Sequence, residues 1–335
     1  TMGVLAGFGP VETSNRLHRG DVYMPITPMF HVHAWGFPYA ATLLGIKQVY
    51  AGRYTPENLI RLIVEEGVTF SHCVPTILQM LLSASEAVNT DLSKLKMLIG
   101  GSALPYGLAE AAMARGINVY SGYGMSETCP VLTISALNSD DEFSLEPRLK
   151  TGNPIPMVDL MTVGKGMTEI ARDGLTVGEI VVRAPWLNAE YVKNPQATRA
   201  LWEGGYLHTG DVGHIDEAGT LMITDRLKDV IKSGGEWVSS LELESLASTV
   251  DGVAEVAAIG IPDEKWGERP LLLIVAQDGL DEDVIRDGVM TATQSAVTAG
   301  ELSKWAVPDR LCFVAEIPKT SVGKIDKKRL RVEFD

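Results

Sequence analysis

Short apolar runs alternate with segments of helical periodicity between residues 56 and 120, and this alternation constrains the fold more than any other feature. Residues 56–66 are predicted to form a helix because Leu59, Ile60, Ile63 and Val64 recur on one helix face. The pattern then predicts a strand over 68–74, a helix around 77–82, a strand over 96–99, a helix over 108–115 and a strand over 117–120. Strands separated by helices form parallel βαβ units, so we predict an α/β fold.

Glycines follow two of these predicted strands. Gly100 and Gly101 follow the strand over 96–99, and Gly122 and Gly124 follow the strand over 117–120. Ligands of parallel sheets bind beyond the carboxyl ends of the strands, and glycine lets the backbone approach a ligand closely. The two loops are therefore predicted to bind a nucleotide.

The second of these loops belongs to the segment Ser-Gly-Tyr-Gly-Met-Ser-Glu-Thr, residues 121–128. The face of Tyr123 can stack on a purine, and the Ser126 hydroxyl beside the Glu127 carboxylate can hold Mg²⁺ and phosphate oxygens. Taken alone, the same residues also fit an ordinary glycine-rich turn after a strand. Motifs elsewhere in the chain are needed to choose between the two interpretations.

The pattern changes after Lys150. Short alternating runs such as residues 179–183, broken by Gly, Pro and Asn, predict a β-rich subdomain in the form of a distorted barrel. Beyond the charged residues 225–229, Ser239 and Glu242 form a capping box for a helix that reaches about Val250. Strands are then predicted over 253–259, 271–277 and 311–317, and a helix over 281–299. These elements make a small α+β domain of ordinary size.

Composition narrows the functions open to the chain. A formal net charge of −14 argues against nucleic-acid binding, which needs a basic face. Cys73, Cys129 and Cys312 are widely spaced, so we predict neither a disulfide framework nor a zinc site, and we expect a reducing compartment, the cytoplasm. The apolar runs are too short for a transmembrane segment, and no signal peptide is visible. Peripheral membrane contact and a homodimer stay open.

Further segments follow one another in the order typical of one family. Together with residues 121–128 they resemble the motifs of the adenylate-forming superfamily, which includes acyl-CoA synthetases, luciferases and peptide-synthetase adenylation domains. The segments are Pro28–Gly36 (acyl pocket), Gly100–Pro105 (adenine side), Tyr206–Asp211 (ribose), Asp225–Asp229 (interdomain hinge), Ser233–Trp237 (following the hinge) and Pro318–Lys324 (catalytic lysine). The resemblance covers nearly the whole chain and is strongest to medium- and long-chain fatty-acyl-CoA synthetases.

The resemblance implies a fold and a domain division. Residues 1–228 would be the C-terminal part of the large αβαβα N-terminal domain, with an α/β subdomain over 1–147 and the β-rich subdomain over 148–228. Residues 229–335 would form a small, mobile C-terminal α+β domain.

It also implies a role for each matching residue. Lys324 would stabilise the charge that develops between a carboxylate and the α-phosphate, while Ser126 and Glu127 would contact phosphate, with Glu127 also binding Mg²⁺. The nucleotide would be bound by Gly101, Ser102, Tyr123, Gly124, Asp211 and Arg226. The acyl pocket would be lined by His31, Trp35 and Val74. The hinge and the CoA surface would be formed by Lys228, Lys232, Gly234, Gly235 and Trp237.

Several of these residues also have ordinary interpretations. Lys324 could be a solvated surface lysine, and Arg226 could form a surface ion pair with Asp225 or Asp229. Gly234 and Gly235 could form a turn into the helix that follows, and Trp237 could be a core residue. Two departures from the family pattern, Ala184 and residues 189–191, are expected to lie outside the site.

One family motif is missing from the printed residues. The family carries a Gly/Ser/Thr-rich phosphate loop ending in Pro-Lys-Gly, and nothing of that composition lies between Thr1 and Pro28. We therefore expect a truncated gene product, an excised piece or an incomplete sequence, without the N-terminal half of the large domain. Such a piece is expected to bind AMP weakly, to gain little from the extra phosphates of ATP, to make no acyl-CoA and to associate through uncovered apolar surface.

The predicted function is that of an ATP-dependent ligase. It would activate a fatty acid as an acyl-adenylate and transfer the acyl group to CoA, using ATP, Mg²⁺ and CoA. Two alternatives stay open: an adenylation-only enzyme that loads a carrier protein, and an inactive remnant that binds nucleotide weakly. The intact Gly-Gly-Glu-Trp segment disfavours the first, and the missing phosphate loop supports the second.

Overall fold

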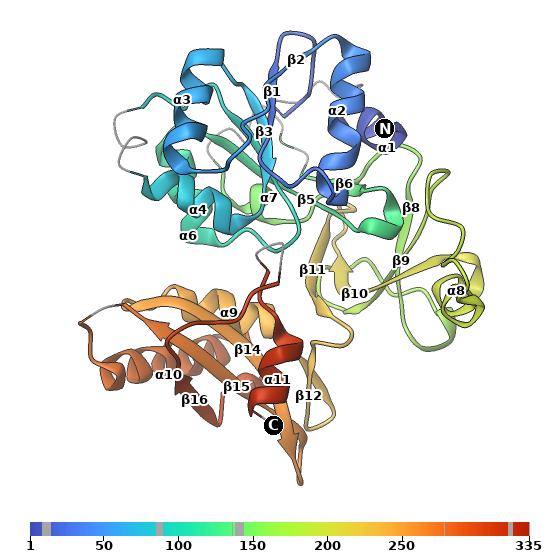
Figure 1. The fold of residues 1–335 in the computed structure, drawn as a ribbon. Coiled ribbons are helices and arrows are strands. Elements are labelled where there is room, and N and C mark those ends of the chain that lie inside the picture. The colour runs from blue at the N-terminus through green and yellow to red at the C-terminus, as the bar shows by residue number, and fades with distance from the viewer. Residues whose placement is uncertain are drawn as a thin grey trace. The chain divides into compact units, whose positions relative to one another are not determined.

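The computed structural model describes residues 1–8, 15–84, 90–135, 137, 144–277, 279–320 and 324–334. The chain divides into two compact units (Figure 1). The first comprises Thr1–Thr209 and Gly213–Ile223, and the second comprises Gly210–Val212 and Thr224–Asp335. The domain boundaries predicted from the sequence, after residues 147 and 228, stay predictions.

The first unit is built on a seven-stranded sheet with the strand order β2-β1-β3-β4-β5-β6-β7. Its strands are β1 (Val22–Pro25), β2 (Lys47–Gln48), β3 (Phe70–Cys73), β4 (Lys96–Ile99), β5 (Asn118–Gly124), β6 (Val131–Ile134) and β7 (Asn153–Pro154). The pairs from β2 through β5 are parallel, while β5–β6 and β6–β7 are antiparallel. The predicted α/β fold with parallel βαβ units is confirmed, and two antiparallel strands extend the sheet.

Helices cover both faces of this sheet (Figure 1). They are α1 (Met2–Phe8), α2 (Val32–Leu44), α3 (Pro56–Glu66), α4 (Pro75–Ser83), α6 (Tyr106–Ala114) and the short α7 (Glu146–Leu149). In β4, Met97 and Ile99 pack in the core with α3, α4 and α6, whereas Leu98 packs in the core with α1 and α2. Strands buried on both faces are apolar at consecutive positions, which is why they appear as unbroken apolar runs.

Helix α3 shows how local signals set the bounds of an element. Thr55 caps its first turn by accepting a hydrogen bond from the Asn58 amide, and Pro56 occupies the first helical position. The helix ends at Gly67, whose φ of 67° is in the left-handed region that favours glycine. The predicted range of residues 56–66 is confirmed.

A four-stranded sheet with the order β11-β10-β9-β8 follows along the chain. Its strands are β8 (Asp159–Val163), β9 (Gly178–Arg183), β10 (Leu207–Ile215) and β11 (Leu221–Arg226), and helix α8 (Pro195–Leu201) lies between β9 and β10 in the sequence. The β-rich character predicted after Lys150 is confirmed, while the distorted barrel stays a prediction.

The second unit carries a five-stranded sheet made of β12 (Ile231–Ser233), β13 (Glu236–Val238), β14 (Val253–Asp263), β15 (Gly267–Ala276) and β16 (Arg310–Phe313). Val256 and Ala258 of β14 share a core with α9 (Ser240–Ser248) and α10 (Glu282–Ala299). The alternate residues Ala257 and Ile259 pack with Leu330 of α11 (Lys327–Phe334). Helices α9 and α10 therefore cover one face and α11 the other (Figure 1).

Strand pairing changes some of the predicted bounds. β5 continues to Gly124 instead of ending at Tyr120, because Gly122 and Tyr123 pair with Ile134 and Thr133 of β6. β14 and β15 are longer than predicted because they form one hairpin from Val253 to Ala276. Ser239 caps α9 as predicted, accepting a hydrogen bond from the Glu242 amide at 3.1 Å. No helix among the described residues has the length and apolarity needed to cross a bilayer.

Candidate active site

The carboxyl ends of four parallel strands bring the predicted acyl and nucleotide segments to one edge of the first unit's sheet. Pro25 is in register with His72, Cys73 with Ile99, and Ile99 with Ser121. The segments that follow these strands carry His31 after β1, Val74 after β3, Gly101 and Ser102 after β4, and Tyr123 and Gly124 at the end of β5. This is the edge at which parallel sheets bind ligands.

The two glycines at the end of β5 are needed by the fold itself. A Cβ atom on Gly124 would lie 1.6 Å from the Pro130 carbonyl oxygen, and one on Gly122 would lie 2.8 Å from the Leu98 side chain. Tyr123 is only 9 % exposed and packs in the core of the β-rich sheet. Close packing within the chain therefore explains these glycines without a ligand, and a purine stacked on Tyr123 stays a prediction.

Glu127 lies in a tight turn directly after β5. Residues Ser126–Thr128 form a single 3₁₀ turn, and the Thr128 hydroxyl accepts a hydrogen bond from the Met125 amide at 2.9 Å and donates to the Pro130 carbonyl at 2.7 Å. Ser126 is exposed and Glu127 is half-buried. The turn thus presents a hydroxyl and a carboxylate next to each other.

This pair suits a nucleotide-bound Mg²⁺ better than a metal held by protein alone. Over the described part of the chain, no group of three or more His, Cys, Asp or Glu could hold a metal ion. Mg²⁺ is commonly bound by one or two carboxylates and completes its shell with phosphate oxygens and waters. Glu127 with Ser126 meets that requirement.

Tyr191 contacts this turn, although no sequence pattern indicates it. The Tyr191 hydroxyl donates to Glu127 Oε1 at 2.7 Å, and the Asn188 amide donates to the Glu127 carbonyl at 3.0 Å. The expectation that residues 189–191 lie outside the site is therefore wrong for Tyr191. Its distance of 64 positions from Glu127 explains the error, because no local pattern relates residues so far apart.

Three of the predicted residues lie together in the second unit: Asp211 on β10, Arg226 at the end of β11, and Lys324. Arg226 Nε lies 3.4 Å from Asp211 Oδ1. The alternative partners named from the sequence are engaged elsewhere, since Asp225 accepts from the Ser240 amide and hydroxyl and Asp229 pairs with Arg331. Arg226 therefore forms an ion pair with the predicted ribose-binding carboxylate.

The Lys324 ammonium is partly buried near these two charges. Burial lowers the pKa of Lys324 below the ordinary lysine value of 10.5, the Arg226 charge lowers it further, and Asp211 opposes the shift. A fully solvated surface lysine would keep its ordinary pKa. Gly323 precedes Lys324 in the motif and would let this loop approach a ligand closely; residues 321–323 lie outside the described residues.

A buried polar cluster anchors the chain directly after Lys324. Lys327 Nζ lies 2.7 Å from Glu244 Oε1 and donates to the Ser240 hydroxyl at 2.6 Å. Ser240 in turn donates to Asp225, the first residue of the predicted hinge, through its amide and its hydroxyl. Glu244 also accepts from the Ala258 amide at 2.8 Å, and burial raises its pKa while Lys327 opposes that rise.

The residues predicted for the hinge and the CoA surface lie close together in the second unit. Lys228 is exposed in the turn between β11 and β12, and Lys232 is in register with Trp237 across the β12–β13 hairpin. Gly234 and Gly235, with φ values of 60° and 85°, form the hairpin's two-residue turn, so the expected alternative of a turn into the helix is wrong. Trp237 is 46 % exposed, which excludes the alternative of a core residue.

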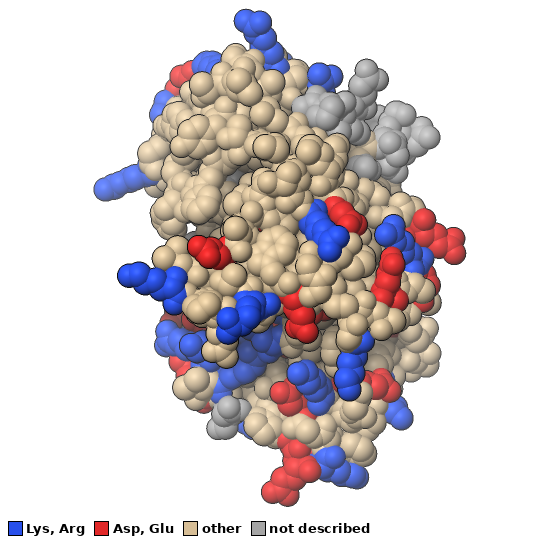
Figure 2. Space-filling view, turned by 90° about the vertical axis from the view of Figure 1, so that its right-hand side faces the viewer, with Lys and Arg blue, Asp and Glu red and all other residues tan. Residues whose placement is uncertain are grey.

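Trp35 lies on the outer side of α2. It is 47 % exposed, and Tyr39 and Leu43, at intervals of four residues, are 68 % and 69 % exposed. The opposite side of α2 buries Phe37, and the Trp35 indole donates to the Phe30 carbonyl at 2.8 Å. Figure 2 shows that uncharged side chains make up most of the α/β part of the first unit on the face in view.

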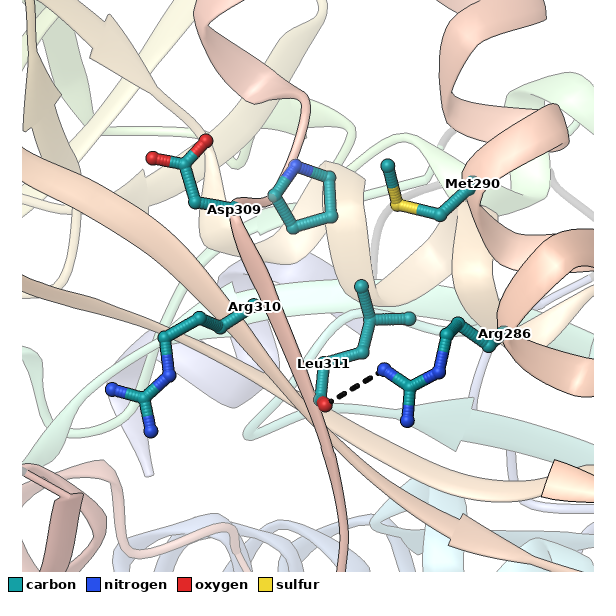
Figure 3. Close-up of a pocket in the computed structure, with 6 residues that line it drawn as sticks. Arg286, Met290, Asp309, Arg310 and Leu311 are labelled. Atoms are coloured by element: carbon teal, nitrogen blue, oxygen red, sulfur yellow. Dashed lines mark hydrogen bonds between the residues drawn. The ribbon is translucent and has the colours of Figure 1, made fainter. Parts of the chain in front are cut away.

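A surface cavity of about 340 Å³ in the second unit contains none of the predicted site residues (Figure 3). It is lined by Arg286, Met290, Pro308, Asp309, Arg310 and Leu311. Arg286 donates a hydrogen bond to the carbonyl of Leu311, another lining residue, at 3.0 Å. Asp309 forms an ion pair with Arg269. The cavity has no part in the function proposed below.

Comparison with known proteins gives matches along most of the chain. The family model described as "AMP-binding enzyme" matches residues 3–192, and the model of the AMP-binding enzyme C-terminal domain matches residues 242–324. A long-chain-fatty-acid–CoA ligase of Thermus thermophilus is 40 % identical over 332 residues, which are 95 % of this chain and 59 % of that protein.

Two further matches broaden the comparison. A 3-methylmercaptopropionyl-CoA ligase of Ruegeria lacuscaerulensis is 37 % identical over 322 residues, covering 94 % of this chain and 58 % of that protein. The solved structure of the amide bond synthetase McbA from Marinactinospora thermotolerans superimposes with a TM-score of 0.83 at 26 % identity, covering 100 % of this chain and 65 % of that one. The chain thus spans somewhat less than two thirds of the length of these proteins.

Proposed function

The chain belongs to the AMP-binding enzyme family, and from this premise we propose that the complete protein is an AMP-forming acyl-CoA synthetase with a fatty acid as its acyl substrate. The observation that carries the proposal is the shared edge at the carboxyl ends of β1, β3, β4 and β5, where the acyl-side and nucleotide-side residues meet. The similarity to a long-chain-fatty-acid–CoA ligase supports the choice of substrate class. A reducing compartment, the cytoplasm, suits the free cysteines.

The reaction has two steps. In the first, a carboxylate oxygen of the fatty acid attacks the α-phosphorus of ATP, the bond to the β-phosphate breaks, and pyrophosphate leaves. In the second, the CoA sulfur attacks the acyl carbonyl, AMP leaves with the bridging oxygen, and the thiol proton passes to solvent. The carboxylate is ionised at neutral pH, so the first step needs positioned charge and no general base.

We assign the residues to these steps as follows. Ser126 and Glu127 would hold phosphate oxygens and Mg²⁺, and the bound ion would neutralise phosphate charge. Asp211 binds the ribose hydroxyls, and Lys324 stabilises the charge that develops at the α-phosphate in the first step. The β12–β13 hairpin with Gly234 and Gly235 serves CoA in the second step, after a turn about Lys228.

We expect the complete protein, given a fatty acid, ATP, Mg²⁺ and CoA, to release one AMP for each acyl-CoA formed. The test is to quantify both products by chromatography across short, medium and long acids. Acyl-adenylate without acyl-CoA, together with loading of a phosphopantetheinyl carrier protein, would favour the adenylation-only enzyme. If neither product forms with any acid, the protein is an inactive remnant and the proposal fails.

Replacing Trp35 by alanine is expected to change the chain-length preference of the complete protein. A half-exposed indole that lines an acyl pocket limits the space available to the chain, whereas the apparent affinity for ATP should stay nearly unchanged. The measurement is kcat/KM for acids of increasing length, with KM for ATP determined in parallel.

Tyr39→Ala is the matched control for this variant. Tyr39 is an exposed aromatic residue one helical turn further along the same side of α2. It lies outside the acyl-pocket segment Pro28–Gly36, so its loss should leave the acyl profile unchanged. An acyl profile that is the same in Trp35→Ala and in the unaltered protein would remove Trp35 from the pocket.

A further inference from the structure

The loop between β9 and α8 contacts both the main chain and the side chain of Glu127. The Asn188 amide donates to the Glu127 carbonyl at 3.0 Å, and the Tyr191 hydroxyl donates to Glu127 Oε1 at 2.7 Å. These two contacts restrict the backbone position of Glu127 and one of its carboxylate oxygens together. Since a carboxylate on an exposed turn would otherwise rotate among several rotamers, the loop reduces that freedom.

Tyr191 is itself fixed by its surroundings. Its main-chain amide donates to the Thr198 hydroxyl at 3.0 Å, and its main-chain carbonyl accepts from the Asn194 amide at 3.1 Å. Asn194 caps α8 by accepting from the Ala197 amide, so these bonds join the loop to the first turn of a helix. The Tyr191 ring packs against the core of the β-rich sheet. The phenol is therefore held in place before any ligand binds.

The bond from Tyr191 to Glu127 joins a phenol hydroxyl donor to a carboxylate acceptor. A hydrogen bond from a neutral donor to a carboxylate is stronger than one between neutral groups, so the contact can orient Glu127 effectively.

We propose that Tyr191 is a positioning residue for Glu127, which holds Oε1 so that the carboxylate presents a fixed orientation to Mg²⁺ and the phosphate oxygens of the nucleotide. The inference rests on the proposed function, because it takes Glu127 as the metal-binding carboxylate. It goes beyond that function by assigning a role to a loop that departs from the family pattern. Residues that orient metal ligands are commonly needed for full metal affinity.

The test is the affinity of the complete protein for Mn²⁺, used as a paramagnetic substitute for Mg²⁺, in the presence of a non-hydrolysable ATP analogue. Tyr191→Phe should raise the dissociation constant of Mn²⁺, measured by electron paramagnetic resonance, by roughly 10–100-fold. The affinity for AMP without metal should not change. In the activity assay, the concentration of Mg²⁺ needed for half-maximal rate should rise by a similar factor.

Tyr50→Phe is the matched control. It removes a phenol of the same unit whose hydroxyl donates to Gln48 Oε1 at 2.8 Å and not to Glu127, so it should leave the dissociation constant of Mn²⁺ unchanged. Thermal unfolding of both variants shows whether a loss of metal affinity reflects a loss of folded protein. An unchanged affinity in folded Tyr191→Phe, or a higher one, would overturn the inference; the latter would mean that Tyr191 competes with the metal.

Glu127→Gln separates the inference from the function on which it rests. If Glu127→Gln binds Mn²⁺ as tightly as the unaltered protein, the assignment of Glu127 as the metal-binding carboxylate is wrong. If Glu127→Gln loses affinity and Tyr191→Phe does not, only the role of Tyr191 is wrong. If Tyr191 acts through Glu127, the double variant should bind Mn²⁺ no more weakly than Glu127→Gln alone.

Discussion

Replacing Lys324 by alanine is expected to slow acyl-adenylate formation in the complete protein by roughly 10²–10³-fold, the usual cost of losing one preorganised charge-stabilising group. The reason is that negative charge develops at the α-phosphate in this step and Lys324 would supply a cation there. Thioester formation from supplied acyl-adenylate and CoA should largely survive. Pyrophosphate release measures the first step, and acyl-CoA formation from the adenylate measures the second.

Lys319→Ala is the matched control, because it removes the same charge five residues earlier. Lys319 pairs with Glu255 at 2.8 Å on the surface and is 40 % exposed. Such pairs contribute about 0–1 kcal/mol, so both steps should keep nearly their full rates. Equal losses in the two steps of Lys324→Ala would contradict the assignment of Lys324 to adenylate formation.

The pH dependence of the first step gives a second test of Lys324. The step needs the protonated lysine, so its rate should fall as pH rises through the lowered pKa of this group, below the ordinary value of 10.5. Lys324→Arg keeps the charge, since a guanidinium is not deprotonated in proteins. Its residual activity should therefore lack this fall, and an unchanged alkaline limb in Lys324→Arg would assign the limb to another group.

Replacing Lys327 by methionine is expected to lower the free energy of unfolding of the second unit by about 3–5 kcal/mol, as measured for buried ion pairs that lose one partner. The side chains of Lys327 and Glu244 are 10 % and 14 % exposed, so the carboxylate would stay buried without its cation. Urea unfolding followed by tryptophan fluorescence measures the change, with Trp266 and Trp305, whose ring centroids lie 4.6 Å apart, as probes in this unit.

The penalty should depend on pH in a definite direction. Burial raises the pKa of Glu244 above 4.5, and Lys327 opposes this rise, so the pKa should be higher still in Lys327→Met. A carboxyl group whose pKa is raised in the folded state favours folding below its unfolded pKa and loses that contribution as pH rises through the folded value. The destabilisation should therefore be smaller below pH 4.5 than at neutral pH.

Two further variants check that the buried charge is the cause. Lys319→Met removes a lysine from a surface pair and should change stability by no more than about 1 kcal/mol. Adding Glu244→Gln to Lys327→Met removes the isolated charge and keeps an acceptor for the Ala258 amide, so part of the lost stability should return. If Lys327→Met unfolds at the same urea concentration as the unaltered protein, the cluster does not contribute to the stability of the second unit.

Much of the fold was predictable because its signals are local. Thr55, Pro56 and Gly67 specify the two ends of α3 within a dozen residues, and Ser239 caps α9 through a residue three positions away. Double-sided burial makes the strands appear as apolar runs that need no knowledge of their partners. The positions of His31, Val74 and Gly101 at one edge follow from the parallel order of these strands.

Pairing between distant segments was not predictable in the same way. β5 extends to Gly124 because β6 lies beside it, and Gly124 has to be a glycine because the Pro130 carbonyl approaches it. Trp237 is exposed although its chemical type suggests burial, since the short β12–β13 hairpin leaves it uncovered. Each of these outcomes depends on which surfaces meet after the chain has folded.

The sequence by itself thus determined the α/β class, the bounds of several helices, the family and the residue types at the site. Only the tertiary structure decided which side chains meet: Tyr191 with Glu127 across 64 positions, and Lys327 with Ser240 across 87. The physical reason is that helix caps, periodicity and glycine turns act over a few residues. Hydrogen bonds and ion pairs between distant residues form only where packing of the sheets and helices brings their segments together.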